Sequence, residues 1–266
     1  MKLQAVIFDW AGTLADHGSR APVSALLNIF SAAGVPITIA EARLSMGLAK
    51  KNHIERILAI PRVRDAWTDA HGTHPTPTDA SDLYARFIPQ QLACLESHSE
   101  LIDGVPAAAN RLRALGLKIG TTTGYTRPML DYLLDRARRQ GFEPDFSACP
   151  DEVPAGRPAP YMCYLNAIHL EAHPLWTMVK IGDTPVDIEE GRNAGMWTIG
   201  ITRTGNEVGL TREEWQAAPD HERHLLLSAA QDKLLAAGAH YVAESVAACD
   251  QILDSIQARL DLGGRP

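Results

Sequence analysis

Carboxylates follow short apolar runs at several points in this sequence. Asp9 ends the run LQAVIFD, and Asp183 ends the run TMVKIGD. Asp187 comes four residues after Asp183, in the first turn of the helix that Pro185 is expected to open. A carboxylate at a strand end can act as a nucleophile or bind a metal ion. For Asp9 alone, a side chain that merely initiates a turn is an equally good interpretation.

Groups that could bind an anion follow two other segments. The run LKIGTTT ends in Thr123, and Gly124 comes next, so a hydroxyl and a free backbone N–H stand together near the start of a helix. Arg157 lies in a loop before the helical segment PYMCYLNAI, and its guanidinium can fork onto oxygen atoms. Taken singly, a Thr-rich strand with a glycine turn and a solvated loop arginine are the more common explanations.

Two adjacent lysines in MGLAKKNHIERIL are separated by helical geometry. Lys50 shares a face with His53 and with the apolar stripe that begins at Ile54. Lys51 lies about 100° further round the helix and is expected to pair with Glu55. Lys50 could simply snorkel from the helix end. Alternatively, a lysine that burial keeps partly unprotonated can form a Schiff base with an aldehyde.

These motifs need a scaffold that brings strand ends together. Apolar runs alternate with helical patterns, which predicts an α/β fold with a Rossmann-like parallel sheet and helices on both faces. In such sheets ligands bind beyond the carboxyl ends of the strands. Three carboxylates meeting there would repel one another and need a cation, and an all-oxygen site favours Mg²⁺. Strands are expected at 3–9, 117–123, 145–149, 177–183, 197–201 and 239–243.

The segment from 17 to 103 shows helical periodicity and no clear strand. A capping box formed by Thr38 and Glu41 opens one helix, Pro61 stops another, and the loop HGTHPTPT at 71–78 separates two helices. We therefore expect an all-helical cap domain at 17–103, inserted after the first strand of an α/β core made of 1–16 and 104–266.

Composition excludes several classes of protein. The 266 residues include 25 basic and 32 acidic side chains, and the net charge of −7 disfavours general binding to nucleic acids. No apolar run is long enough for a transmembrane helix, and the N-terminus does not read as a signal peptide. The four cysteines form no C-x-x-C pair, so reduced thiols are expected rather than a zinc site. The sequence thus predicts a cytoplasmic protein without a membrane partner.

The motifs FDWAGTL, TTTGY, the loop with Arg157 and GDTPVD occur in order at strand ends. This set resembles the haloacid dehalogenase superfamily of aspartate-nucleophile phosphotransferases, and the helical insert matches the position of that superfamily's cap. One position departs: the residue two after the nucleophile, usually an Asp in superfamily phosphatases, is Ala11. Without this general acid an ester phosphatase loses roughly 10²–10⁴ in rate, so a leaving group other than an alkoxide is expected.

With Ala11 and Lys50 present together, the sequence resembles the phosphonatase family, the phosphonoacetaldehyde hydrolases. The similarity extends over most of the chain. The segments MGLAKKNH, TTTGYTR, PDEVPAGRPAPYMCY and GDTPVDIEEGRNAGMWT carry it. The resemblance implies hydrolysis of the P–C bond of phosphonoacetaldehyde to acetaldehyde and phosphate, through a lysine Schiff base and an aspartyl phosphate. A protonated imine accepts the electrons of the broken bond, so Ala11 is compatible with this chemistry.

The resemblance also implies roles for the candidate residues. The catalytic side chains are the nucleophile Asp9 and the imine-forming Lys50. The groups that hold or support Mg²⁺ are Asp9, Asp183, Asp187 and the backbone carbonyl of Ala11. The groups that bind phosphoryl oxygens or flank the substrate are Thr123, Gly124, Arg157, Tyr125, Met46 and His53. Ser19 lies in the linker near the site without an assigned role, and a homodimer formed through the cap helices is expected.

Two other functions stay open at this point. A haloacid dehalogenase-type phosphatase or phosphomutase would act on a phosphate monoester with the same core, although Ala11 disfavours it. A non-catalytic sensor of phosphorylated ligands would keep the fold, although it need not retain Asp9.

Overall fold

The core of the protein is a six-stranded sheet with the strand order β3-β2-β1-β4-β5-β6. The computed structural model describes every residue from Met1 to Pro266, and all five strand pairings are parallel. The Rossmann-like parallel sheet expected from the sequence is therefore confirmed, with each strand inside its predicted run. The strands are β1 (Ala5–Phe8), β2 (Lys118–Thr122), β3 (Phe146–Ala148), β4 (Met178–Gly182), β5 (Trp197–Ile201) and β6 (Tyr241–Ala243).

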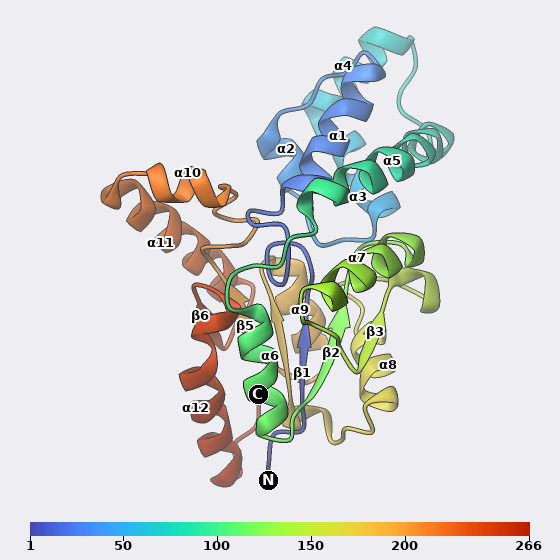
Figure 1. Ribbon diagram of the computed structural model, residues 1–266. Helices are drawn as coiled ribbons and strands as arrows, with labels where there is room; N and C mark the ends of the chain where they lie inside the picture. The colour runs from blue at the N-terminus through green and yellow to red at the C-terminus, as the bar shows by residue number, and fades with distance from the viewer.

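Helices cover both faces of this sheet (Figure 1). Side chains of β1 alternate between the faces: Ile7 shares an apolar cluster with Cys163, whereas Phe8 shares the larger cluster with Leu112. The sheet is thus buried on both sides, which is typical of parallel sheets. The core helices are α6 (Val105–Ala114), α7 (Arg127–Arg139), α8 (Tyr161–His169), α9 (Pro185–Asn193), α10 (Arg212–Ala217), α11 (Asp220–Ala236) and α12 (Asp250–Asp261), with short 3₁₀ turns η1 (Pro150–Glu152), η2 (Leu175–Thr177) and η3 (Val246–Ala248).

The remaining helices gather above the carboxyl edge of the sheet, in blue to green at the top of Figure 1. Helix α5 packs along α1 and α3, and Pro61, expected to stop a helix, follows α3 and opens α4. The capping box of Thr38 and Glu41 forms as expected. These helices are α1 (Arg20–Ala32), α2 (Ile39–Arg43), α3 (Lys50–Leu58), α4 (Pro61–His71) and α5 (Pro77–His98).

Two chain segments connect these helices to the sheet. Ala15 forms isolated bridges with Ala11 and with Leu101, so the outgoing and returning segments lie side by side. The buried carboxylate of Asp16 accepts hydrogen bonds from the backbone N–H groups of Arg20 (3.0 Å) and Ala21 (2.9 Å). The Asp16 side chain, four residues before the helix begins, therefore supplies hydrogen-bond acceptors for two free N–H groups in the first turn of α1.

The cysteines are all free thiols, and all but the half-buried Cys94 are buried. None of the helices combines the length and apolar composition that crossing a bilayer requires.

Candidate active site

Three neighbouring strands end at the same edge of the sheet, below the cap helices. Phe8 at the end of β1 pairs with Thr121 of β2 on one side and with Ile181 of β4 on the other. Asp9 and Asp183, which follow these strands, are therefore brought together as the sequence predicts. Thr123 and Gly124 follow β2 at the same edge.

The carboxylates of Asp9, Asp183 and Asp187 are buried and each offers an oxygen within 4.8 Å of the others. Burial, and then the charges of Asp9 and Asp187, raise the pKa of Asp183 well above its ordinary value. Burial and the charge of Asp187 likewise raise the pKa of Asp9, although Arg157 opposes this. Such a cluster is relieved by a cation bound to its oxygens, and hard oxygen donors fit Mg²⁺.

Asp187 differs from the other two carboxylates because its oxygens already accept bonds from the protein. One oxygen lies 2.8 Å from Lys180 Nζ and 2.9 Å from Arg157 Nη1. The other accepts a 2.6 Å hydrogen bond from Thr184 Oγ1, which caps α9. Although burial opposes them, Arg157 and Lys180 hold the pKa of Asp187 below its ordinary value. The geometry therefore suits Asp187 to orienting the site rather than to presenting a free oxygen.

Arg157 lies at the floor of the site, almost fully buried, in the loop before α8. Its Nη2 is 2.7 Å from Asp9 Oδ1 and also donates to Thr122 Oγ1 at 2.7 Å. Its Nε donates to Glu190 Oε2 at 3.0 Å. The guanidinium thus reaches from the helix α9 carboxylate to the Asp9 carboxylate, where an anionic group of a ligand would compete for it.

Sequence reasoning missed three members of this network: Thr122, Lys180 and Glu190. All are fully buried. Thr122 Oγ1 donates to Glu190 Oε2 at 2.9 Å, and Lys180 Nζ lies 3.4 Å from the same oxygen. The available signal was Lys180 itself, since a lysine inside the apolar run MVKIG needs a buried counter-charge.

Lys50 enters the site from the cap, as the first residue of α3. Its side chain is 5% exposed, and its Nζ lies 5.1 Å from the centroid of the Tyr125 ring. Burial, with a smaller effect from Arg157, lowers the pKa of Lys50 to about 8, although the charge of Asp9 opposes the change. Lys51 is exposed as predicted. The expected ion pair of Lys51 with Glu55 does not form, because both side chains extend into solvent, where such a pair gains little.

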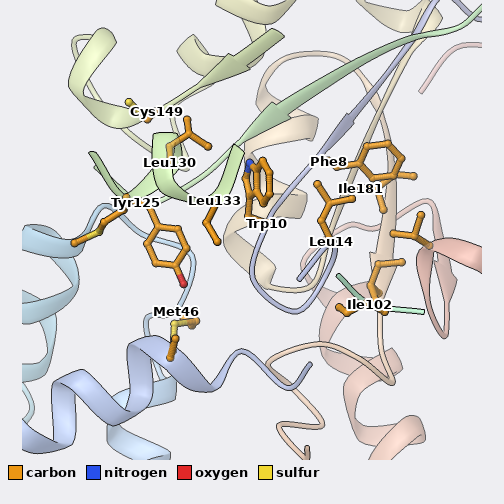
Figure 2. Close-up of a cluster of buried hydrophobic side chains, with 14 of the residues drawn as sticks. Phe8, Trp10, Leu14, Met46, Ile102, Tyr125, Leu130, Leu133, Cys149 and Ile181 are labelled. Atoms are coloured by element: carbon orange, nitrogen blue, oxygen red, sulfur yellow. The ribbon is translucent and has the colours of Figure 1, made fainter. Parts of the chain in front are cut away.

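The other residues predicted near Lys50 are also buried. His53 Nε2 bonds to the carbonyl oxygen of Ala42 at 2.9 Å, so Nε2 carries the proton and the unpartnered Nδ1 keeps a lone pair. Burial and the charge of Lys50 lower the pKa of His53 to about 3, so the ring is neutral. Figure 2 shows the Tyr125 ring extending toward Met46, and the buried Tyr125 hydroxyl has no hydrogen-bond partner.

A small cavity of about 20 Å³ lies where these groups meet. The cap and the core approach closely beside it: a Cβ on Gly124 would lie 2.5 Å from the carbonyl oxygen of Leu48, and a Cβ on Gly47 would lie 2.5 Å from Thr184 Oγ1. The predicted residues that line the cavity are Asp9, Ala11, Ser19, Met46, Lys50, Thr123, Gly124, Tyr125, Arg157 and Asp183. Of the predicted set, His53 and Asp187 lie behind the lining.

A larger hollow of about 590 Å³ lies elsewhere, between the linkers and α10. Its arginines are mostly paired with carboxylates, as in the ion pairs of Arg20 with Glu214 and of Arg212 with Asp103. It contains none of the residues that the motifs predict, so the small cavity is the better candidate.

Comparison with known proteins places these features in a wider group. The family of haloacid dehalogenase-like hydrolases matches residues 3–195. A phosphonoacetaldehyde hydrolase of Syntrophobacter fumaroxidans is 43% identical over 264 residues, covering 99% of this chain and 95% of that protein. One from Bacillus cereus is 42% identical over 257 residues, or 97% of each chain. A crystal structure of a phosphonoacetaldehyde hydrolase-like protein from Oleispira antarctica superposes with a TM-score of 0.98 at 39% identity, covering 100% of this chain and 96% of that one.

Proposed function

Because the chain belongs to the phosphonoacetaldehyde hydrolase family of the haloacid dehalogenase-like hydrolases, we propose that it hydrolyses the P–C bond of phosphonoacetaldehyde to acetaldehyde and phosphate. The observation that carries the proposal is the pairing of two features. A buried lysine from the cap faces the carboxylate that follows β1, and Ala11 stands where an ester phosphatase needs its acid.

The first step is condensation of Lys50 with the aldehyde. The unprotonated amine attacks the carbonyl carbon, water leaves, and a protonated imine forms. A pKa of about 8 leaves a usable fraction of neutral amine near pH 7. The lone pair on His53 Nδ1 and the unpartnered Tyr125 hydroxyl are suited to moving protons during this condensation.

The second step is transfer of phosphorus from carbon to Asp9. A carboxylate oxygen of Asp9 attacks phosphorus, the P–C bond breaks, and its electron pair moves into the imine to give an enamine. Arg157, Thr123 and the backbone N–H of Gly124 are suited to holding the phosphoryl oxygens. The enamine is protonated on carbon, so the leaving group needs no acid at position 11.

The third step restores the protein. One water molecule hydrolyses the aspartyl phosphate of Asp9 to phosphate, and another hydrolyses the imine of Lys50 to acetaldehyde. Haloacid dehalogenase-like hydrolases generally use Mg²⁺, and the donors suited to holding it here are Asp9, Asp183 and the carbonyl oxygen of Ala11, with Asp187 in support. The bound cation would offset the charge that accumulates at the phosphoryl group.

The test is release of acetaldehyde and phosphate from phosphonoacetaldehyde, measured with and without Mg²⁺. We expect turnover that disappears on chelation, and Asp9→Asn should remain folded but inactive. A panel of phosphate monoesters decides the alternative of a phosphatase or phosphomutase, which Ala11 disfavours. Turnover of an ester with none of the phosphonate would contradict the proposal.

We further propose that the protein forms a homodimer through its cap helices, as the family resemblance implies. Sedimentation equilibrium measures the mass in solution, and a value of one 28.9 kDa chain at micromolar concentration would contradict the dimer.

A further inference from the structure

One arginine of the cap is bonded to the core rather than to its own domain. Arg43, the last residue of α2, donates from Nη1 to the carbonyl oxygen (3.0 Å) and the Oδ1 (2.8 Å) of Asn206. Its Nη2 donates to the carbonyl oxygen of Gly209 at 3.0 Å. Nη1 also donates to the carbonyl oxygen of Gly18, in the linker, at 2.9 Å.

The loop that contains Asn206 and Gly209 fits closely around the Arg43 side chain. Gly209 has φ +69, and a Cβ there would lie 2.7 Å from Arg43 Cζ. All the acceptors are backbone or amide oxygens, and no carboxylate lies within ion-pair distance of the guanidinium. Only a planar fork with several N–H groups can bond to so many divergent oxygens at once, so a lysine is not equivalent.

The opposite side of this loop touches the candidate active site. The backbone N–H of Asn206 donates to Asp183 Oδ2 at 2.7 Å. Thr204 Oγ1 donates to the carbonyl oxygen of Gly12, next to Ala11, at 2.7 Å. The segment Thr202–Leu210 therefore contacts the cap arginine on one side and the carboxylate cluster on the other.

We infer that Arg43 is a positioning residue for Lys50, an inference that rests on the proposed function of that lysine. The chain that follows Arg43 carries Met46, Gly47 and then Lys50. Gly47 packs against Thr184, so Arg43 and Gly47 anchor both ends of a short segment on the core. The bonds of Arg43 to residues 206 and 209 join the cap to the core, so any movement of the cap away from the core must break them, and while formed they hold the lysine in the site.

Arg62 offers a matched control in the same domain. Its Nε donates to Glu41 Oε1 at 2.6 Å and its Nη2 to Glu41 Oε2 at 2.5 Å, so both partners belong to the cap. Arg62→Gln removes a guanidinium and its bonds without touching the core.

The decisive measurement needs no substrate. Formaldehyde with cyanoborohydride methylates accessible lysine amines, and peptide mapping gives the rate at Lys50. The buried Lys50 should react slowly in the native protein and roughly tenfold or more faster in Arg43→Gln, because the open population rises. Arg62→Gln should keep the native rate. An unchanged rate at Lys50 in Arg43→Gln would overturn the inference.

A second variant guards against misfolding of the first. Asn206→Ala removes one acceptor of Arg43 but keeps the backbone N–H that binds Asp183, so it should raise the methylation rate by a smaller factor. A native melting temperature with an unchanged rate in both variants counts against the inference.

Turnover separates this inference from the proposed function. In Arg43→Lys we expect kcat/KM for phosphonoacetaldehyde to fall roughly tenfold, with slower borohydride trapping at Lys50. If methylation responds but the native protein does not cleave the phosphonate, the proposed function fails and the positioning role stands. If the native protein cleaves it and methylation does not respond, the positioning role fails alone.

Discussion

At the scale of single residues, the adjacent lysines give the sharpest test of the imine. Lys50→Arg keeps a positive charge but has no amine that can condense with an aldehyde, so turnover should be abolished. Lys51→Arg should be nearly silent, because Lys51 is exposed. Borohydride added with substrate should fix an adduct that peptide mass mapping assigns to Lys50. An adduct on Lys51, or full activity in Lys50→Arg, would contradict the Schiff base.

Two adjacent glutamates provide a second test at this scale. Glu190 is fully buried against Arg157, whereas Glu189 is exposed. Glu190→Gln leaves the Arg157 Nε without its carboxylate and should destabilise the protein by about 3–5 kcal/mol. Glu189→Gln should stay within about 0.5 kcal/mol of the native value. Urea unfolding measures both.

The same pair separates stability from positioning. At temperatures where Glu190→Gln remains folded, its KM for the phosphonate should rise more than its kcat falls, because Arg157 is no longer aimed at the phosphoryl group. An unchanged KM in the folded variant would assign Glu190 a purely structural role.

The site residues that could be found from the sequence are those with a distinctive local pattern beside them in the chain. Asp9, Thr123 and Asp183 each follow an apolar run, and Lys50 stands out on an apolar stripe. Glu190 gave no such local signal, because its partners Arg157 and Lys180 meet it only in the folded sheet. Lys180 stands out inside an apolar run, but nothing near it in the chain identifies its partner. Ion pairs between side chains of different elements depend on the topology of the fold, so local residue spacing cannot predict them.

At the scale of elements, the two capping boxes of Thr-x-x-Asp type allow a matched comparison. Thr184 caps α9 and bonds to the buried Asp187, whereas Thr76 caps α5 with the half-buried Asp79. Thr184→Ala and Thr76→Ala should each cost about 1 kcal/mol of stability. Only Thr184→Ala should also lower kcat/KM, by roughly tenfold, because Asp187 loses its 2.6 Å hydrogen bond. Equal kcat/KM values in the two variants would separate Asp187 from the chemistry.

Two of the helices that sequence reasoning missed have weak apolar faces. Helix α4 buries only Val63 and Trp67, and helix α11 buries only Ala230 and Leu234, while its Leu225 is 69% exposed. Periodicity cannot identify a helix that presents so little to the core. The six strands were predicted from their patterns, whereas helix α6 was missed although it buries Val105, Ala108, Ala109 and Leu112.

At the scale of the whole molecule, the buried amine of Lys50 should oppose folding. Its pKa falls from 10.5 in the unfolded chain to about 8 in the folded protein. Below pH 8 folding must therefore bury a charged amine that water solvates in the unfolded chain, which costs free energy. The unfolded chain binds more protons between these values, so stability should rise with pH across that window. Lys50→Met should therefore stabilise the inactive protein by up to ~3 kcal/mol at pH 7.

Thermal unfolding as a function of pH checks this expectation. The gain in Lys50→Met should shrink as pH rises from 8 toward 10.5, and the exposed Lys51→Met should show no gain at any pH. A variant Lys50→Met that is less stable than the native protein at pH 7 would mean that the lysine is paired rather than strained in the folded state.

The position of β1 at the centre of the sheet bears on how the protein is made. Ala5 pairs with Lys118 and with Met178, so the first strand to leave the ribosome waits for partners that are translated much later. Helices α1 to α5 are contiguous between Arg20 and His98 and can pack during that wait. The apolar segment Ala5–Phe8 is unpaired until β2 emerges, and one of its edges stays open until β4 emerges, so we expect chaperones to bind this segment during synthesis.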